Sequence, residues 1–130
     1  MQGLGNDFVC MNYEDVGNYN LKIFTKFICD RHFGIGADGL ILISRSKIAD
    51  CKMRIFNSDG TEAQMCGNGI RCLAKYVYEK KLIQKEKITV ETLAGIKEVE
   101  YKLENGKIMT LRVKMGVPQT QTNKLPIYVP

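Results

Sequence analysis

Residues Met65 to Cys72 read MCGNGIRC, which sets two cysteines and two glycines around Asn68 directly before a segment with helical periodicity. Four kinds of site fit this stretch: a metal clip, a disulfide, a phosphate cradle, or a reactive thiol at a helix N-terminus. The first N–H groups of a helix have no internal acceptor, so they bind anions and stabilise a thiolate. Cys66 is therefore a candidate base or nucleophile, and the backbone amides of Gly67 and Asn68 are candidate anion donors.

The competing interpretation of Cys66 is an inert cysteine beside a glycine-rich turn, because most cysteines of this kind are small buried hydrophobes. A structural zinc site needs four ligands in close pairs. Cys66 and Cys72 have no second pair near them, and His32 is the one histidine of the chain, so we expect no metal. The five cysteines fit no small secreted framework, so we expect thiols, with Cys72 in the core.

Two further loops carry asparagines next to turn residues, GLGND around Asn6 and FNSDG around Asn57. An asparagine side chain offers two donors and an acceptor without charge. Asn6, Asn57 and Asn68 could together hold the ammonium and carboxylate of an amino acid. The plainer alternative is that asparagine is common in turns.

Length and composition limit the function classes. The 130 residues suffice for one domain, 45% are hydrophobic, and no apolar run approaches the roughly 18 residues of a membrane span. The net charge is +5, but the lysines are scattered among glutamates and do not alternate with aromatics. We therefore expect no membrane and no nucleic-acid partner, a small anionic molecule as ligand, and a cytoplasmic location.

The first half of the chain predicts a strand over 7–12 after a GLGN loop, then a helix of about three turns within 18–34. Asn18 or Asn20 can cap this helix and Gly34 can end it. The sequence GIGADG follows, but a dinucleotide loop must follow a strand and open a helix, and here the order is inverted. We predict a tight loop. The apolar face of the helix comprises Leu21, Phe24, Phe27 and Ile28.

The second half predicts strands over 40–44 and 52–57, a helix over 70–81, a strand over 87–92 and a hairpin turning at Asn105-Gly106. The order β-α-β-β-α-β-β-β is typical of an α+β fold with mainly antiparallel strands. We expect one domain over 1–117. Residues 118–130 are expected to be an exit linker or an edge segment.

Four segments together resemble the diaminopimelate epimerase family: GLGNDF (3–8), RHFGIGADGLI (31–41), FNSDGTEAQMCGNGIRCLAKYV (56–77) and MGVP (115–118). The resemblance implies one half of a two-domain fold, with strands wrapped around a central helix. It also implies an isomerase that interconverts L,L- and meso-diaminopimelate without a cofactor, using two cysteines on opposite faces of the α-carbon.

By motif match Cys66 is one of those cysteines, and the substrate contacts map onto Asn6, Asn57, Gly67 and Asn68. The chain resembles only the N-terminal half of the family, and nothing in it matches the C-terminal half that carries the partner cysteine. We therefore expect the isolated chain to lack full activity and to need the C-terminal half or a second chain; a homodimer is another candidate assembly. The alternatives are half of a different cofactor-independent amino-acid racemase or isomerase, and a non-catalytic structural remnant.

Overall fold

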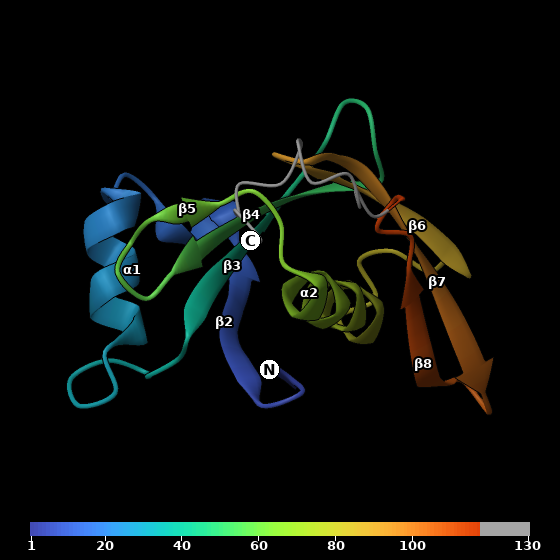
Figure 1. Ribbon diagram of the computed structural model, residues 1–130, viewed down its shortest axis with the longest axis horizontal. Coiled ribbons are helices and arrows are strands. Elements are labelled where there is room, and N and C mark those ends of the chain that lie inside the picture. The colour runs from blue at the N-terminus through green and yellow to red at the C-terminus, as the bar shows by residue number, and fades with distance from the viewer. Residues whose placement is uncertain (118–130) are drawn as a thin grey trace, which may run out of the picture.

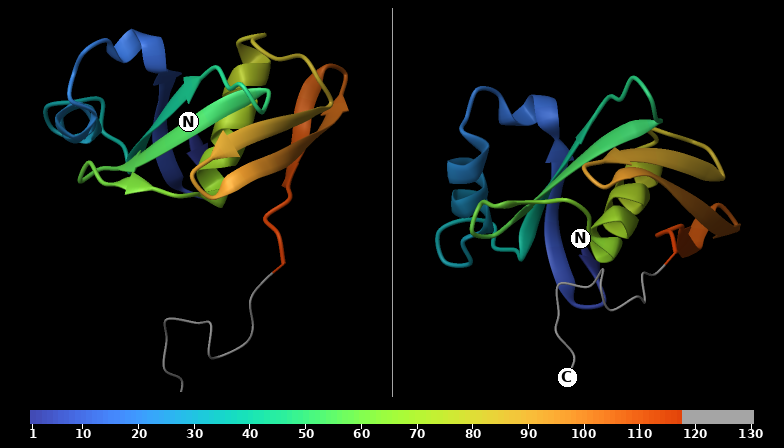
Figure 2. Two further views of the ribbon diagram at one scale, coloured as in Figure 1. Left: turned by 90° about the horizontal axis from the view of Figure 1, so that it is seen from above. Right: turned by 45° about the horizontal axis from the view of Figure 1, so that its top comes forward.

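The computed structural model describes residues 1–117, which form an eight-stranded sheet that curls around one helix (Figure 1). Helix α2 lies in the concave side of the curl, while α1 lies on the outer side, as the views of Figure 2 show. The elements in chain order are β1 (Gln2–Gly3), β2 (Asn6–Asn12), the 3-10 helix η1 (Tyr13–Val16), α1 (Leu21–Cys29), β3 (Gly39–Ser44), β4 (Cys51–Asn57), β5 (Glu62–Ala63), α2 (Gly67–Glu79), β6 (Lys87–Thr92), β7 (Gly95–Glu104) and β8 (Lys107–Val113).

The sheet has the strand order β1-β2-β3-β4-β6-β7-β8, with β5 paired to β4. The predicted α+β class with mainly antiparallel strands around a central helix is confirmed. Two pairs differ from that pattern, because β2 runs parallel to β3 and β4 runs parallel to β6. Each of these pairs is joined through a helix, α1 or α2, since parallel neighbours need a long crossover connection. The sequence analysis also missed two short strands and η1; β1 ends at Gly3, inside the GLGN segment that we predicted to be only a loop.

The main core lies between α2 and the concave face of the sheet. Burial of Ile70, Leu73 and Val77 is complete, and these residues recur along one side of α2 at three- and four-residue steps. They pack against inward-facing strand residues, which alternate with less buried ones along β4 and β6. Cys72 is 4% exposed, so its predicted place in the core is confirmed.

A second core lies between α1 and the outer face of β3 and β4. The side chain of Asn20 caps α1 by accepting a hydrogen bond from the N–H of Ile23 at 3.2 Å, as one of the two predicted caps does. Two details of the prediction were wrong. The helix ends at Cys29, five residues before Gly34. Phe27 is 64% exposed and so lies off the packed face. It is two positions from each of the buried residues Thr25 and Cys29, which places it on the opposite side of the helix.

The predicted hairpin is confirmed. Asn105 and Gly106 have φ values of 50° and 73°, the left-handed backbone that a two-residue turn of this kind requires. No helix among residues 1–117 combines the length and apolar composition needed to cross a membrane. The predicted linker over 118–130 lies outside the described residues.

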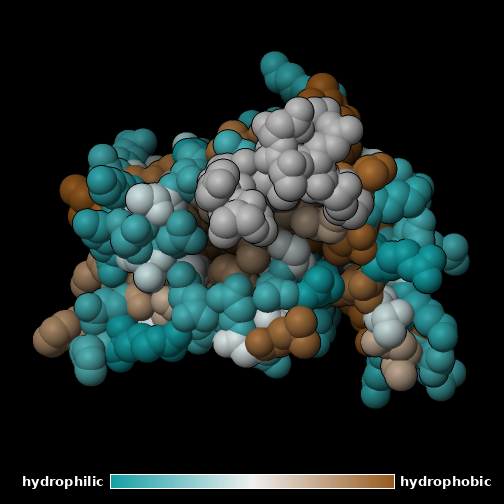
Figure 3. All heavy atoms as spheres, in the orientation of Figure 1, coloured by the Kyte–Doolittle hydropathy of each residue, from teal (hydrophilic) through white to brown (hydrophobic). Residues whose placement is uncertain are grey.

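Hydrophilic side chains cover most of the face drawn in Figure 3, and hydrophobic ones show between them toward the side of β6, β7 and β8. Leu93, Ile96 and Met109 are large apolar residues on these strands or their turns that remain about half exposed. The polar residues considered next lie at the other side of α2, where β2, β3 and β4 meet.

Candidate active site

Cys66 is the N-cap residue of α2. Its backbone is extended, its carbonyl accepts the first helical bond from the N–H of Ile70 at 2.9 Å, and its sulfur accepts the N–H of Gly69 at 3.3 Å. The thiol thus occupies the place that a serine or aspartate oxygen takes in an ordinary cap. The N–H groups of Gly67 and Asn68 precede the first bond of the helix, so the helix itself offers them no acceptor.

Gly69 allows this first turn of α2 to sit directly on the sheet. A Cβ built at Gly69 would lie 2.8 Å from the Cδ1 atom of Ile55 and 3.3 Å from that of Ile41. Both isoleucines are buried strand residues of the main core. The missing side chain therefore fixes how deep the start of α2 lies, and with it the position of the Cys66 sulfur.

Asn6 is the predicted site residue that the structure brings to Cys66. The sulfur of Cys66 lies 3.9 Å from Oδ1 of Asn6, which places the thiol as donor and the amide oxygen as acceptor. The two residues are 60 positions apart in sequence and are both half-buried. Strand β1 contributes to this approach, because Gly3 lies against the first turn of α2, where an added Cβ would be 3.4 Å from Asn68.

Asn68 and Asn57 lie near this region with their side chains engaged elsewhere. Oδ1 of Asn68 accepts a hydrogen bond from Nη2 of Arg71, one turn further along α2. Nδ2 of Asn57 donates to Oγ1 of Thr61 at 3.0 Å inside its own turn. Among residues 1–117, Nδ2 of Asn68 has no acceptor and Oδ1 of Asn57 has no donor, so these two atoms can face a ligand.

The register of the sheet brings Asn57 to the same edge as Asn6. Gly39, the first residue of β3, pairs with Phe8 of β2 on one side and with Asn57 of β4 on the other. A Cβ at Gly39 would lie 2.5 Å from the backbone oxygen of Phe56, so only glycine fits between these strands. The ends of three strands that carry polar loops therefore meet beside Cys66.

The sequence analysis missed a charged cluster at this edge, formed by Asp7, Arg31 and Asp38. Nη2 of Arg31 lies 2.8 Å from Oδ1 of Asp7 and 3.0 Å from Oδ1 of Asp38. The guanidinium of Arg31 holds the pKa of the Asp7 carboxyl below its usual range. The parallel pairing of β2 with β3 places the two aspartates side by side, since each directly precedes a paired residue. Their separation of 31 positions hides this pairing in the sequence.

The other four cysteines have environments that keep the proton on sulfur. Burial raises the pKa of the Cys10 thiol to about 11 and that of the Cys51 thiol to about 12. Burial also raises the pKa of the Cys29 and Cys72 thiols. None of the five cysteines, all of which lie within residues 1–117, forms a disulfide. Cys66, like Cys10, is half-buried, and it differs from Cys10 in accepting a helix N–H at its sulfur.

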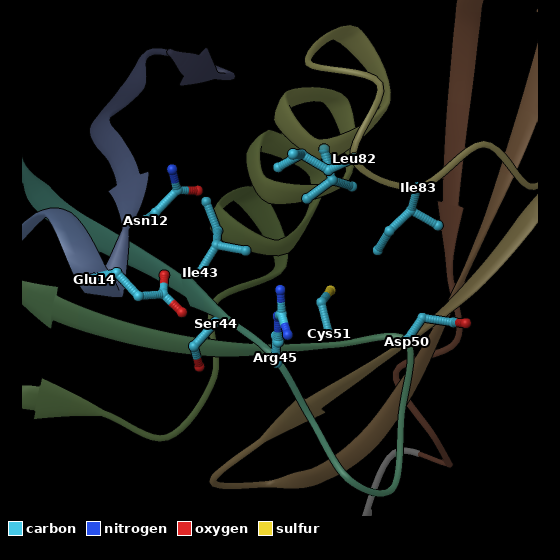
Figure 4. Close-up of a pocket in the computed structure, with 10 residues that line it drawn as sticks. Asn12, Glu14, Ile43, Ser44, Arg45, Asp50, Cys51, Leu82 and Ile83 are labelled. Carbon is cyan, nitrogen blue, oxygen red and sulfur yellow. The ribbon is translucent and has the colours of Figure 1, made fainter.

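A separate cavity of about 490 Å³ opens at the opposite end of α2 (Figure 4). Its residues come from the end of β2 and η1, from the end of β3 through the turn to the start of β4, and from α2 and the loop that follows it. None of the predicted site residues lines it. The lining residues are Asn12, Glu14, Ile43, Ser44, Arg45, Asp50, Cys51, Val77, Leu82 and Ile83.

Comparison with known proteins decides the family. The family model described as diaminopimelate epimerase matches residues 1–121. The chain belongs to the diaminopimelate epimerase family. It is 55% identical over 127 residues to the diaminopimelate epimerase of Caldanaerobacter subterraneus subsp. tengcongensis and 52% identical to that of Methanococcus maripaludis (strain S2 / LL). Each match covers 98% of this chain and 46% of the relative, so the chain spans about half the length of these epimerases.

Solved structures share the fold of this diaminopimelate epimerase family member at low identity. A methylitaconate-delta-isomerase matches with a TM-score of 0.64 at 14% identity, over 79% of this chain and 33% of that one. A phenazine biosynthesis protein of the PhzF family from Bacillus anthracis matches with a TM-score of 0.61 at 22% identity, over 81% of this chain and 33% of that one. At these identities the likeness describes the fold alone.

Proposed function

We propose that this chain is the N-terminal half of a cofactor-independent diaminopimelate epimerase and that Cys66 exchanges the α-proton of the substrate. The observation that carries the proposal is the position of the Cys66 sulfur, at the N-cap of α2 and beside Asn6. The family match supports the choice of substrate.

The proton transfer balances as follows. The Cys66 thiolate takes the α-hydrogen of one diaminopimelate isomer as a proton and becomes a thiol, and the electron pair of the broken C–H bond moves onto the carboxylate. The developing negative charge lies next to the N–H groups of Gly67 and Asn68, where partial positive charge of the helix is concentrated. One well-placed donor of this kind can lower such a barrier by about 3 kcal/mol. A second acid then delivers a proton to the opposite face of the carbon.

Asn57 and Asn68 recognise different groups of the amino acid, according to which polar atom of each side chain is not already bonded within residues 1–117. Oδ1 of Asn57 accepts from the substrate ammonium, because its Nδ2 is bonded to Thr61. Nδ2 of Asn68 donates to the carboxylate, because its Oδ1 is bonded to Arg71. Asn6 contacts the substrate beside the reacting sulfur.

The second acid comes from the C-terminal half of the epimerase, on the same or a second chain, and we propose one domain over 1–117 with 118–130 as an exit linker or edge segment. The support is that the chain spans 46% of the length of its relatives. Pairing of two copies into a homodimer is compatible with this arrangement. A cytoplasmic location accords with five unpaired thiols.

The test joins residues 1–117 to the C-terminal half of the 55% identical relative from Caldanaerobacter. The fused protein and the isolated chain are each incubated with L,L-diaminopimelate in D2O. Chiral chromatography follows the isomers, and mass spectrometry follows deuterium at the α-carbon. We expect turnover by the fused protein and none by the isolated chain.

Two variants of the fused protein make the test specific. Cys66→Ala should abolish isomerisation, whereas Cys10→Ala, which removes a thiol from β2 outside the site, should retain it. Turnover by the isolated chain, or by the Cys66→Ala protein, would contradict the proposal. An inactive fused protein that still binds diaminopimelate would favour a binding half without chemistry.

A further inference from the structure

We propose that Asp38 is a positioning residue that sets the orientation of the Asn6 amide and thereby keeps the Asn6 oxygen, rather than its nitrogen, facing the Cys66 sulfur. The inference rests on the proposed function, since it concerns how the reacting thiol is prepared. Asp38 does not touch Cys66 and acts through Asn6 alone.

The orientation follows from the chemistry of the contacts. Oδ2 of Asp38 lies 2.9 Å from Nδ2 of Asn6. An ionised carboxylate can only accept hydrogen bonds, so the amide nitrogen must face Asp38. The amide oxygen then points the other way, toward the Cys66 sulfur at 3.9 Å. The amide oxygen can only accept a hydrogen bond, so it favours the state in which the sulfur carries its proton.

Asp38 is itself held on three sides. Its Oδ2 also accepts the backbone N–H of Asp7 at 3.0 Å, its Oδ1 accepts from Nη2 of Arg31 at 3.0 Å, and its own N–H donates to Oδ1 of Asp7 at 2.9 Å. The side chains of Arg31 and Asp38 are 56% and 43% exposed. Ion pairs this exposed contribute little to stability. The cluster therefore adds only a small stabilisation, and its main contribution to the site is the position in which it holds the Asp38 carboxylate.

A matched pair of substitutions separates orientation from charge. Asp38→Asn and Asp38→Ala remove the same negative charge, and Asp7, Arg31, Arg71 and the N-terminal amine remain in both variants. In Asp38→Asn the new amide has one oxygen and one nitrogen. Its oxygen can satisfy two donors, Nδ2 of Asn6 and the N–H of Asp7, or in the opposite orientation one donor from Arg31. The first orientation is favoured, so the Asn6 amide keeps its own orientation. Asp38→Ala leaves that amide free to turn its N–H toward the sulfur.

The first measurement is the rate at which iodoacetamide modifies Cys66 in the two variants of this chain at neutral pH. An N–H donor to the thiolate increases the thiolate fraction, and one net hydrogen bond corresponds to about fivefold. The nucleophilicity of the thiolate falls about twofold at the same time. We expect Cys66 of Asp38→Ala to react about two- to threefold faster than Cys66 of Asp38→Asn. Equal rates in the two variants would overturn the proposal.

The second measurement needs no substitution. The side-chain amide protons of Asn6 in the unmodified chain should exchange with water more slowly than those of Asn105, which is exposed at the hairpin turn. Proton-exchange NMR reads both side chains in one sample. Equal exchange would refute the proposed hold on Asn6. Neither measurement involves turnover, so an inactive fused enzyme would remove the proposed function and leave this inference standing.

Discussion

Modification of the five cysteines should be strongly selective for Cys66. The perturbation is a limiting amount of iodoacetamide at about pH 7.5, applied to the native chain and to the Cys66→Ala and Cys10→Ala variants. The thiolate is the reacting form of cysteine, so selectivity follows from how each side chain holds its proton and how accessible its sulfur is. Cys66 is half-buried at a helix start, and three of the other four cysteines are fully buried.

The expected difference in labelling rate follows from the raised pKa values of two thiols, Cys10 and Cys51. Burial raises the pKa of Cys10 to about 11 and that of Cys51 to about 12. At about pH 7.5 such thiols form thiolate about 300-fold and about 3,000-fold less often than an accessible cysteine of ordinary pKa near 8.5. A thiolate of higher pKa is a stronger nucleophile, which offsets about 13-fold of this deficit for Cys10 and about 40-fold for Cys51. Chemistry alone should therefore slow Cys10 by about 20-fold and Cys51 by about 75-fold relative to such a cysteine, and burial of the sulfur adds to this.

Intact-mass and peptide mass spectrometry give the site and rate of labelling. The native chain should gain one label, on Cys66, before any second label appears. Cys10→Ala should react like the native chain, and Cys66→Ala should stay unlabelled over the same time. Labelling of Cys10 or Cys51 at a rate similar to that of Cys66 would refute the reasoning from burial.

Two stability predictions follow from contacts outside the thiol site. The hydroxyl of Tyr101 donates to the backbone oxygen of Ala74 in the middle of α2 at 2.9 Å and is buried, so Tyr101→Phe should cost about 1 kcal/mol in urea unfolding. Tyr78→Phe is the control, because that exposed hydroxyl reaches a backbone oxygen only at 3.5 Å; an equal loss in both would count against the buried bond. The guanidinium of Arg31 lowers the pKa of Asp7 in the folded chain. This carboxyl therefore stabilises the fold above its ordinary pKa of about 4, and the stabilisation is lost as the pH falls toward the lower pKa of the folded state. Asp7→Asn should therefore lower the melting temperature at neutral pH, with a difference from the native chain that shrinks below about pH 4; a constant difference across this range would exclude the ion pair as its cause.

Local sequence signals predicted most of the elements and the place of Cys66. The periodicity over 70–81 located α2, and the glycines before it indicated a helix start with the cysteine at its cap. Asn105-Gly106 predicted the hairpin because few other residue pairs adopt the left-handed backbone twice in a row. The inverted order of elements around GIGADG correctly separated a loop from a nucleotide site. In each case the information lies within a few neighbouring residues.

Failures of prediction arose where neighbours in space are distant in sequence. The parallel pairing of β2 with β3 depends on how α1 crosses the sheet, which no local pattern records. The short strand β5 exists only because β4 offers it an edge. Phe27 was assigned to the apolar face of α1 by spacing, yet α1 packs through the side that carries Thr25 and Cys29 and leaves Phe27 exposed. These outcomes are set by packing between elements.

The sequence by itself determined that a cysteine caps a helix within a family of epimerases, because capping, glycine turns and a family motif are written in consecutive residues. Only the tertiary structure decided which asparagine faces that cysteine and what holds the asparagine in place. Asn6 reaches Cys66 across 60 positions, and Asp38 reaches Asn6 across 32. The physical reason is that hydrogen bonds act over about 3 Å, and strand register alone brings such distant residues within that range.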